Sequence, residues 1–194
     1  MTAALLRVEA LVAGYGRAVV GPLSFEVRAG EILGLRGPNG CGKSTLLNAI
    51  AGRADVLDGQ IQPMPRLRLA YQTQQSVRLP IMPITGRELL GVAGASCAGL
   101  PTELDRVLGT RLDRLSGGQL QLLHVWAALA SPADLVMLDE PTNNLDPSRE
   151  RMLAGMLTGW RRGAGMASGH RAALLVSHEE AFLTAVCSRI IEIG

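Results

Sequence analysis

A glycine-rich, positively charged turn follows an apolar run within the first quarter of the chain. Residues 37–45 read GPNGCGKST, and they stand between an apolar run that ends at Arg36 and a helical pattern over residues 46–51. This is the pattern GxxxxGK[ST] in a strand, loop and helix context. Glycines let successive backbone N–H groups turn toward one anion, and the helix N-terminus behind them adds partial positive charge. The stretch therefore predicts a phosphate-binding loop that follows a buried parallel strand.

Two side chains of this turn indicate a nucleotide with its metal ion. Lys43 is predicted to reach the terminal phosphates as a point charge, and the Ser44 hydroxyl to ligate Mg2+. Cys41 stands at a variable position of the pattern, so we interpret it as a small filler rather than a nucleophile. The predicted nucleotide-binding residues of the turn are Gly37, Pro38, Asn39, Gly40, Cys41, Gly42, Lys43, Ser44 and Thr45.

Composition favours one cytoplasmic domain. The chain has 194 residues, of which 47% are hydrophobic, and this is enough for one sizeable core. Its 19 basic and 17 acidic residues give a net charge of +2 and are interspersed, so no basic stripe indicates a nucleic-acid partner. Cys41, Cys97 and Cys187 stand far apart without metal-ligand spacing, as free thiols in a reducing compartment do. We predict a single domain over residues 1–194.

Neither a secretion signal nor a membrane-spanning segment is predicted. The first residues carry no basic region followed by an apolar core. The longest apolar window, residues 120–138, is interrupted by Gln121, His124, Pro132 and Asp134. These patterns predict a cytoplasmic chain that reaches a membrane only through a partner.

Short apolar runs predict an α/β fold with a sheet of mixed type. Residues 23–27 alternate as a half-exposed antiparallel strand does, whereas residues 135–138 and 173–176 are continuously apolar, as parallel strands covered on both faces are. A helix is predicted after Asp146-Pro147, which form an N-cap and first-turn pair. The other predicted strands are residues 6–11, 32–35, 67–71 and 190–193.

Acidic residues and a histidine come directly after two of the continuously apolar runs. Asp139 and Glu140 stand at the strand end where ligands bind in open α/β sheets. Because unpaired buried acids are costly, we expect Asp139 to hold Mg2+ through its water shell. Glu140 is placed to take a proton from the water that attacks the γ-phosphate. His178 follows the next run, and from the same edge it is predicted to donate to the γ-phosphate.

One aromatic residue is a candidate for contact with the base. Tyr15 stands between Gly14 and Gly16 in a turn, where its ring is predicted to stack on adenine. The alternative is a tyrosine that only packs against its own turn.

A second anion site is predicted at another helix N-terminus. Residues 115–119 read LSGGQ and open the helical run 120–130. The Ser116 side chain and the glycine N–H groups form a cradle like that of the first turn, and one triphosphate rarely needs two such cradles. The residues assigned to this second site are Ser116, Gly117, Gly118 and Gln119.

With this stretch the sequence resembles the nucleotide-binding domains of ABC ATPases, which have a P-loop NTPase core, an N-terminal antiparallel β subdomain and a helical subdomain. In that family LSGGQ is the signature motif, which closes over ATP held by the P-loop of a second copy. The resemblance implies ATP and Mg2+ as cofactors and a homodimer that sandwiches ATP. It is carried by an ordered set of motifs over nearly the whole chain: Tyr15, GPNGCGKST, a glutamine, LSGGQ, LVMLDE, Asn-Leu-Asp and Ser-His.

The resemblance also implies roles for three further parts of the chain. Gln74 resembles the glutamine that touches Mg2+ and the attacking water, with Gln72 and Gln75 as alternatives. Residues 144–146 resemble the loop that crosses the dimer interface, and residues from about 76 to 133 resemble a short helical subdomain that receives the permease. The chain departs from the family in the signature helix, where Leu122 and Ala127 replace arginines.

The resemblance implies the ATPase subunit of an ABC transporter, peripheral on the inner face of the cell membrane, that powers a separate membrane permease. Residues 68–74 and 79–85 are similar to the zinc and manganese importer branch, with drug or lipid export as the rival within transport. Residues 143–146 are also similar to ABC proteins that act in translation or regulation without a permease, although those generally carry two ATPase domains. A scaffold without activity is disfavoured because Lys43, Asp139, Glu140 and His178 are all present.

Overall fold

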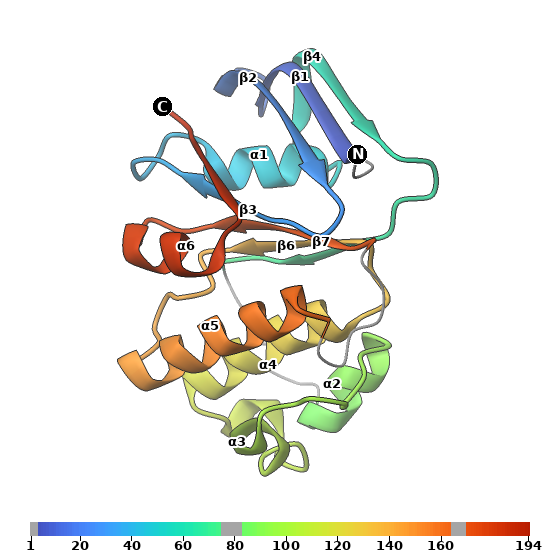
Figure 1. Ribbon diagram of the computed structural model, residues 1–194, viewed down its shortest axis with the longest axis vertical. Coiled ribbons are helices and arrows are strands. Elements are labelled where there is room, and N and C mark those ends of the chain that lie inside the picture. The colour runs from blue at the N-terminus through green and yellow to red at the C-terminus, as the bar shows by residue number, and fades with distance from the viewer. Residues whose placement is uncertain (1–3, 75–82, 164–169) are drawn as a thin grey trace.

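The computed structural model of the chain describes residues 4–74, 83–163 and 170–194. Its elements form layers (Figure 1): an antiparallel sheet, the helix α1 (Lys43–Ile50), a parallel sheet, and a helical layer with α4 (Gly117–Ala130) and α5 (Pro147–Arg161). Each face of the parallel sheet is thus covered by helix. The mixed α/β fold predicted from the sequence is confirmed.

The antiparallel sheet is built from the first two strands and one later strand. β1 (Ala4–Gly14) lies between β2 (Ala18–Arg28) and β4 (Asp55–Pro63), and Val8 pairs with Phe25 on one side and Ile61 on the other. β4 was missing from the sequence prediction. Its nine residues, DVLDGQIQP, are almost all exposed, so they carry little of the apolar alternation that marks a half-buried strand.

The parallel sheet has the order β5 (Leu69–Gln72), β6 (Leu135–Asp139), β7 (Ala172–Val176), β3 (Ile32–Arg36) and β8 (Arg189–Glu192). Every residue of β6 and β7 is buried, which explains their continuously apolar sequences. Because all five strands are parallel, their carboxyl ends meet at one edge of the sheet. The residues that follow β3, β6 and β7 are therefore neighbours.

Side chains of the parallel strands alternate between two hydrophobic cores. Leu33, Leu35 and Met137 pack on the α1 side, whereas Ile32 and Leu138 pack on the side of α4 and α5. Trp126 and Trp160 extend the second core and donate their indole N–H groups to backbone carbonyls. This alternation decides which face of the sheet each residue at the carboxyl edge reaches.

The helix predicted after Asp146-Pro147 is confirmed as α5. The Asp146 side chain accepts hydrogen bonds from the backbone N–H groups of Ser148 and Arg149, and Pro147 is the first helical residue. The sequence prediction lacked α2 (Gly86–Val92), α3 (Thr102–Asp105) and α6 (Glu180–Val186), which are too short to show a clear helical period. The helical subdomain over residues 76–133 and the single domain over the whole chain stay predictions.

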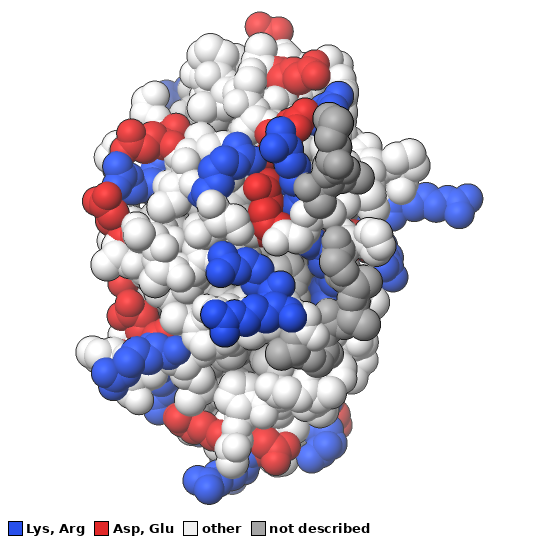
Figure 2. Space-filling view, viewed as in Figure 1, with Lys and Arg blue, Asp and Glu red and all other residues white. Residues whose placement is uncertain are grey.

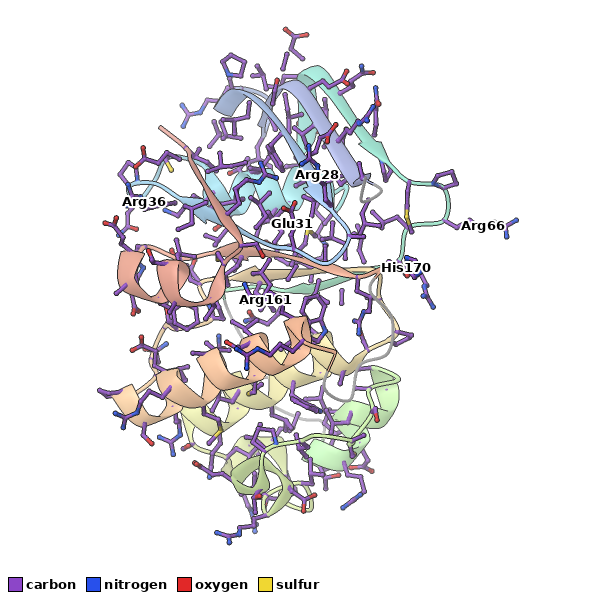
Figure 3. All side chains as sticks on the ribbon, viewed as in Figure 1. Arg28, Glu31, Arg36, Arg66, Arg161 and His170 are labelled. Atoms are coloured by element: carbon purple, nitrogen blue, oxygen red, sulfur yellow. The ribbon has the colours of Figure 1, made fainter. Side chains whose placement is uncertain are left out.

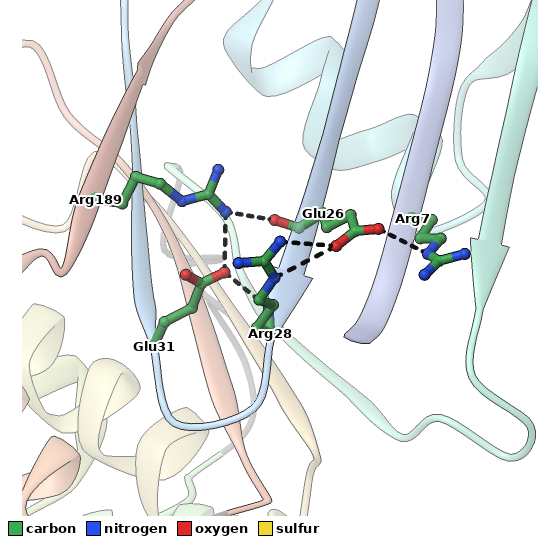
Figure 4. A network of polar contacts seen from close by, with 5 residues as sticks. All are labelled: Arg7, Glu26, Arg28, Glu31 and Arg189. Atoms are coloured by element: carbon green, nitrogen blue, oxygen red, sulfur yellow. Dashed lines mark hydrogen bonds and ion pairs between the residues drawn. The ribbon is translucent and has the colours of Figure 1, made fainter. Parts of the chain in front are cut away.

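Charged side chains tie the two sheets together at the surface. Glu26 on β2 pairs with Arg7 on β1, and Arg189 on β8 donates to the Glu26 carbonyl at 2.7 Å and to Glu31 at 3.2 Å (Figure 4). Arg28 contacts both acids (Figure 4). Basic and acidic side chains are interspersed over this face of the molecule (Figure 2). Such exposed pairs each stabilise the fold by only about 0–1 kcal/mol.

Candidate nucleotide-binding site

The turn between β3 and α1 has the geometry of an anion cradle. A Cβ atom on Gly37 would lie 2.2 Å from the Ile193 carbonyl oxygen, and one on Gly42 would lie 2.6 Å from Cβ of Val20. Gly42 is also the N-cap of α1 in a left-handed conformation, with φ of 95°. Within the described residues no side chain caps this helix, so its first N–H groups are available to an anion.

Lys43 lies within the turn. Its side chain is 6% exposed, and its Nζ donates to the carbonyl oxygens of Gly37 at 2.7 Å and Pro38 at 3.0 Å. The ammonium group is thus held over the loop at the mouth of the cradle that Gly37 and Gly42 shape. A phosphate that enters the cradle meets this charge together with the helix N-terminus.

Asp139 ends β6 on the α1 side of the sheet, and it is 2% exposed. Its Oδ2 accepts a hydrogen bond from the Tyr71 hydroxyl at 3.3 Å, whereas its Oδ1 is buried and has no hydrogen-bond partner in the described part of the chain. Burial raises the pKa of Asp139, while hydrogen bonds from Ser44 and Tyr71 act in the opposite direction. A buried carboxylate oxygen without a partner beside a serine hydroxyl fits Mg2+, which prefers hard oxygen ligands.

Glu140 and His178 are in direct contact across β6 and β7. Glu140 is 5% exposed, and its Oε2 accepts from the backbone N–H of His178 at 3.3 Å and lies 2.8 Å from His178 Nδ1. The Glu140 backbone is left-handed with φ of 49°, and its N–H donates to the Val176 carbonyl at 2.9 Å. The structure therefore brings together the acid and the histidine that the sequence predicted at this edge.

Tyr15 lies in the turn between β1 and β2. Its hydroxyl accepts a hydrogen bond from Asn48 Nδ2 on α1 at 2.9 Å, while its side chain stays 55% exposed. The ring is thus fixed at one end next to α1 and accessible along its length, as stacking on a base requires.

The LSGGQ stretch forms the N-terminus of α4 as predicted. The Ser116 hydroxyl accepts from the Gln119 N–H at 3.3 Å, and the Gln119 side chain accepts from the Ser116 N–H at 3.0 Å, which makes a reciprocal capping box. A Cβ atom on Gly118 would lie 2.7 Å from Cδ of Arg149, so the flexible arginine side chain would have to move to make room for it. α4 lies on the opposite face of the parallel sheet from α1 (Figure 1), so the two predicted anion sites are on different sides of the sheet.

The glutamines near β5 differ in burial. Gln74 is exposed just beyond the strand, and Gln75 lies outside the described residues. Gln72 is the last residue of β5 and is 6% exposed; its Nε2 donates to the Thr73 carbonyl at 2.6 Å, and its Oε1 is buried with no partner among the described residues. The assignment of Gln74 as the Mg2+-contacting glutamine stays a prediction.

A groove of about 530 Å³ opens beside β5, the edge strand of the parallel sheet. Residues from β5, from α4 and from the turn after α1 line it, among them Arg53, Tyr71, Gln72 and His124. His124 Nε2 is buried without a hydrogen-bond partner in the described ranges, and burial lowers the pKa of this histidine. Sequence reasoning missed the groove because its lining comes from four separate segments of the chain.

Other ligating side chains do not gather at this edge. His170 comes just before β7, on the opposite side of the molecule from Arg36, which ends β3 (Figure 3). The described residues contain no group of three or more His, Cys, Asp or Glu side chains that could hold a metal ion. In the same part of the chain, no helix combines the length and apolarity needed to cross a bilayer.

The cradle, the buried Asp139 and the paired Glu140 define the chain as a P-loop nucleotide-binding protein. A family model described as ABC transporter matches residues 20–143. The chain therefore belongs to the ABC transporter family, and the predicted ABC-type ATPase is confirmed.

Curated relatives are similar over most of the chain. The zinc import ATP-binding protein ZnuC of Marinobacter nauticus is 29% identical over 98% of this chain and 75% of its own length. ZnuC of Paracoccus denitrificans is 33% identical over 89% of this chain and 68% of its own. ZnuC of Jannaschia sp. is 32% identical, with coverage of 96% and 78%.

Solved structures share the fold. An inward-facing putative metal-chelate type ABC transporter matches 99% of this chain and 80% of its own, with a TM-score of 0.76 and 23% identity. RNase-L Inhibitor matches 99% of this chain and 37% of its own, with a TM-score of 0.82 and 24% identity. At these identities the likeness shows the fold alone.

Proposed function

We propose that this ATPase powers the import of zinc through a separate membrane permease, and that it lies on the inner face of the cell membrane. The observation that carries the proposal is the similarity to zinc import ATP-binding proteins over nearly the whole chain. To the loop, Asp139, Glu140 and His178 we assign the chemistry of ATP hydrolysis, because Lys43 is held over the loop and Glu140 is held by His178.

In the proposed mechanism the loop N–H groups and Lys43 bind the phosphates, and Glu140 acts on water. The water oxygen attacks the γ-phosphorus, its proton passes to a Glu140 carboxylate oxygen, and the bond from phosphorus to the bridging β–γ oxygen breaks. His178 holds Glu140 through its backbone N–H and ring. Ser44, Asp139 and Gln74 would hold Mg2+, which neutralises charge on the phosphates when bound.

A second copy of the chain completes the site in this proposal. The LSGGQ stretch lies on the other face of the parallel sheet from the loop (Figure 1), so it is poorly placed to contact a phosphate bound in the same chain. Two chains that face each other head to tail would bring the Ser116 hydroxyl and the α4 N-terminus of each one to the γ-phosphate held by the other.

The groove beside β5 is the proposed docking place for the permease. It adjoins Gln74, and among the described residues its lining includes Arg53 and Arg68 but no Asp or Glu, so it suits a segment that carries an acidic residue. The unpartnered Gln72 Oε1 and His124 Nε2 favour an occupant with polar side chains that complete their hydrogen bonds.

Growth and uptake in native cells test the proposal. We expect a deletion strain to fail in medium depleted of zinc, and to recover growth and uptake of radioactive zinc with the wild-type chain but not with Glu140→Gln. Pull-down from native membranes should recover a permease. Full growth of the deletion strain without zinc, or recovery of the chain with ribosomes rather than membranes, contradicts zinc import.

A further inference from the structure

We propose that Tyr71 is a positioning residue that links Asp139 to the groove beside β5. One end of its side chain contacts the carboxylate assigned to Mg2+, and the other part lines the groove. The groove side of this inference rests on the proposed docking of a permease, whereas the contact with Asp139 stands without it.

The contact with Asp139 follows from strand pairing. β5 and β6 are parallel neighbours, with Tyr71 beside Met137 and Gln72 beside Leu138. Tyr71 and Met137 both pack in the core on the α1 side, and Asp139, two residues further along β6, reaches the same face. The Tyr71 hydroxyl thus meets Asp139 Oδ2 at 3.3 Å.

This hydrogen bond decides which carboxylate oxygen is left for a cation. Oδ2 is tied to Tyr71, whereas Oδ1 is buried and has no hydrogen-bond partner within the described residues. Without the Tyr71 hydroxyl, Oδ2 loses this hydrogen bond, and the carboxylate is held less firmly, with Ser44 as its remaining side-chain hydrogen-bond donor among the described residues. A metal site whose ligand is not held by a second residue binds its ion more weakly.

The same side chain is accessible from the groove. Tyr71 lines it together with Arg53, whose guanidinium carbon lies 5.4 Å from the centre of the Tyr71 ring. Arg53 is exposed, and it forms no ion pair with any described residue. An acidic residue that enters the groove and attracts Arg53 therefore moves a group stacked on Tyr71. Through the hydroxyl this movement reaches Asp139.

Mg2+ titration tests the contact with Asp139. A fluorescent, non-hydrolysable ATP analogue is titrated with Mg2+ in the wild-type chain, in Tyr71→Phe and in the control Thr158→Val. The control also loses a hydroxyl hydrogen bond, the one to the Ala154 carbonyl in α5. We expect Tyr71→Phe to need about tenfold more Mg2+ for half-maximal binding, the scale of one hydrogen bond to a charged group. Binding without Mg2+ should stay unchanged.

An unchanged Mg2+ requirement in Tyr71→Phe overturns the positioning role. So does an equal loss of binding with and without Mg2+, because it indicates general damage to the site. The phenylalanine keeps the ring and its packing, and thermal unfolding of both variants checks that they are folded. Neither outcome depends on zinc or on a permease.

A fluorescent reporter tests the link to the groove. Leu69 lines the groove and is 40% exposed, so Leu69→Trp places an indole there at little cost to packing. When Mg2+ is added to the protein with the ATP analogue bound, the tryptophan emission should change more in Leu69→Trp than in the wild-type chain. We expect this extra change to disappear in Leu69→Trp combined with Tyr71→Phe. If Mg2+ causes no extra change in the emission of Leu69→Trp, or the same extra change with and without Tyr71→Phe, the proposed link between Asp139 and the groove is wrong.

Discussion

The left-handed backbone of Glu140 makes a quantitative prediction about stability. With φ of 49°, an L-amino acid at this position costs about 1–2 kcal/mol relative to ordinary backbone. Glycine avoids this cost, although its greater freedom in the unfolded chain offsets about 0.5–1 kcal/mol. We therefore expect Glu140→Gly to be more stable than Glu140→Ala by about 0.5–1 kcal/mol, since the two variants lose the same carboxylate contacts.

The matched comparison is a position with ordinary helical geometry. Thr158 lies inside α5, where glycine is about 1 kcal/mol worse than alanine. The four variants Glu140→Gly, Glu140→Ala, Thr158→Gly and Thr158→Ala are unfolded in urea and followed by circular dichroism. The difference in free energy of unfolding between glycine and alanine should have opposite signs at the two positions. Both Glu140 variants should also hydrolyse ATP about 10²- to 10⁴-fold more slowly if this carboxylate accepts the proton. Alanine at least as stable as glycine at position 140 refutes the assignment of strain.

Three further predictions concern the loop before α1, the LSGGQ stretch and Asp139. Lys43 is the only lysine in the chain, so an amine-reactive reagent should label only Lys43 and the N-terminus. ATP with Mg2+ should slow the labelling of Lys43, as measured by peptide mass mapping. Labelling that ATP does not slow contradicts the place of Lys43 at the phosphates. In the Glu140→Gln chain, Ser116→Ala should abolish the ATP-dependent dimers measured by light scattering, while nucleotide still binds. The control Thr85→Ala removes the matching capping box of α2 and should leave the dimers intact. Dimers in both variants refute the contact of Ser116 with the nucleotide of the second copy. Asp139→Asn should raise the free energy of unfolding of the nucleotide-free chain at neutral pH, because burial raises the pKa of Asp139 and disfavours its charged form. This gain in stability should shrink as the pH falls, because the wild-type carboxyl then takes up its proton in both the folded and the unfolded chain. A gain in stability that grows toward acid pH contradicts this prediction.

The centre of the site could be predicted from sequence because its geometry is set by the sheet. Once β6 and β7 are parallel neighbours, residues that follow them must meet at one edge, and Glu140 and His178 do so at 2.8 Å. The loop before α1 is similarly local, since its glycines and lysine are contiguous. Local chemistry and one topological rule were therefore sufficient for these residues.

Residues whose roles depend on an edge strand and on distant packing could not be predicted. Tyr71 appears in the sequence only as the last residue of an apolar run, and nothing local indicates its bond to Asp139, which is 68 residues away. His124 belongs to a helix that is buried almost all round, so its position facing the groove carries no periodic signal. β4 was missed for the opposite reason, because its mostly exposed residues show no apolar pattern.

Buried polar atoms without hydrogen-bond partners distinguish the parts of the site that can bind a ligand from the parts that are already hydrogen-bonded. Each buried polar atom without a partner costs about 1–3 kcal/mol, so a folded chain keeps few of them. The described residues contain five such atoms: Asp139 Oδ1, Gln72 Oε1 and His124 Nε2 lie at the carboxyl edge of β6 or along the groove beside β5, and the other two are Arg149 Nε and Arg171 Nη2. Glu140, by contrast, is already hydrogen-bonded through His178. In the proposed mechanism, Glu140 is held in place before nucleotide binds, whereas Asp139 and the groove would gain their missing partners from a cation and a docked segment. Tyr71 contacts both places, and this is the basis of the proposal that binding at one of them affects the other.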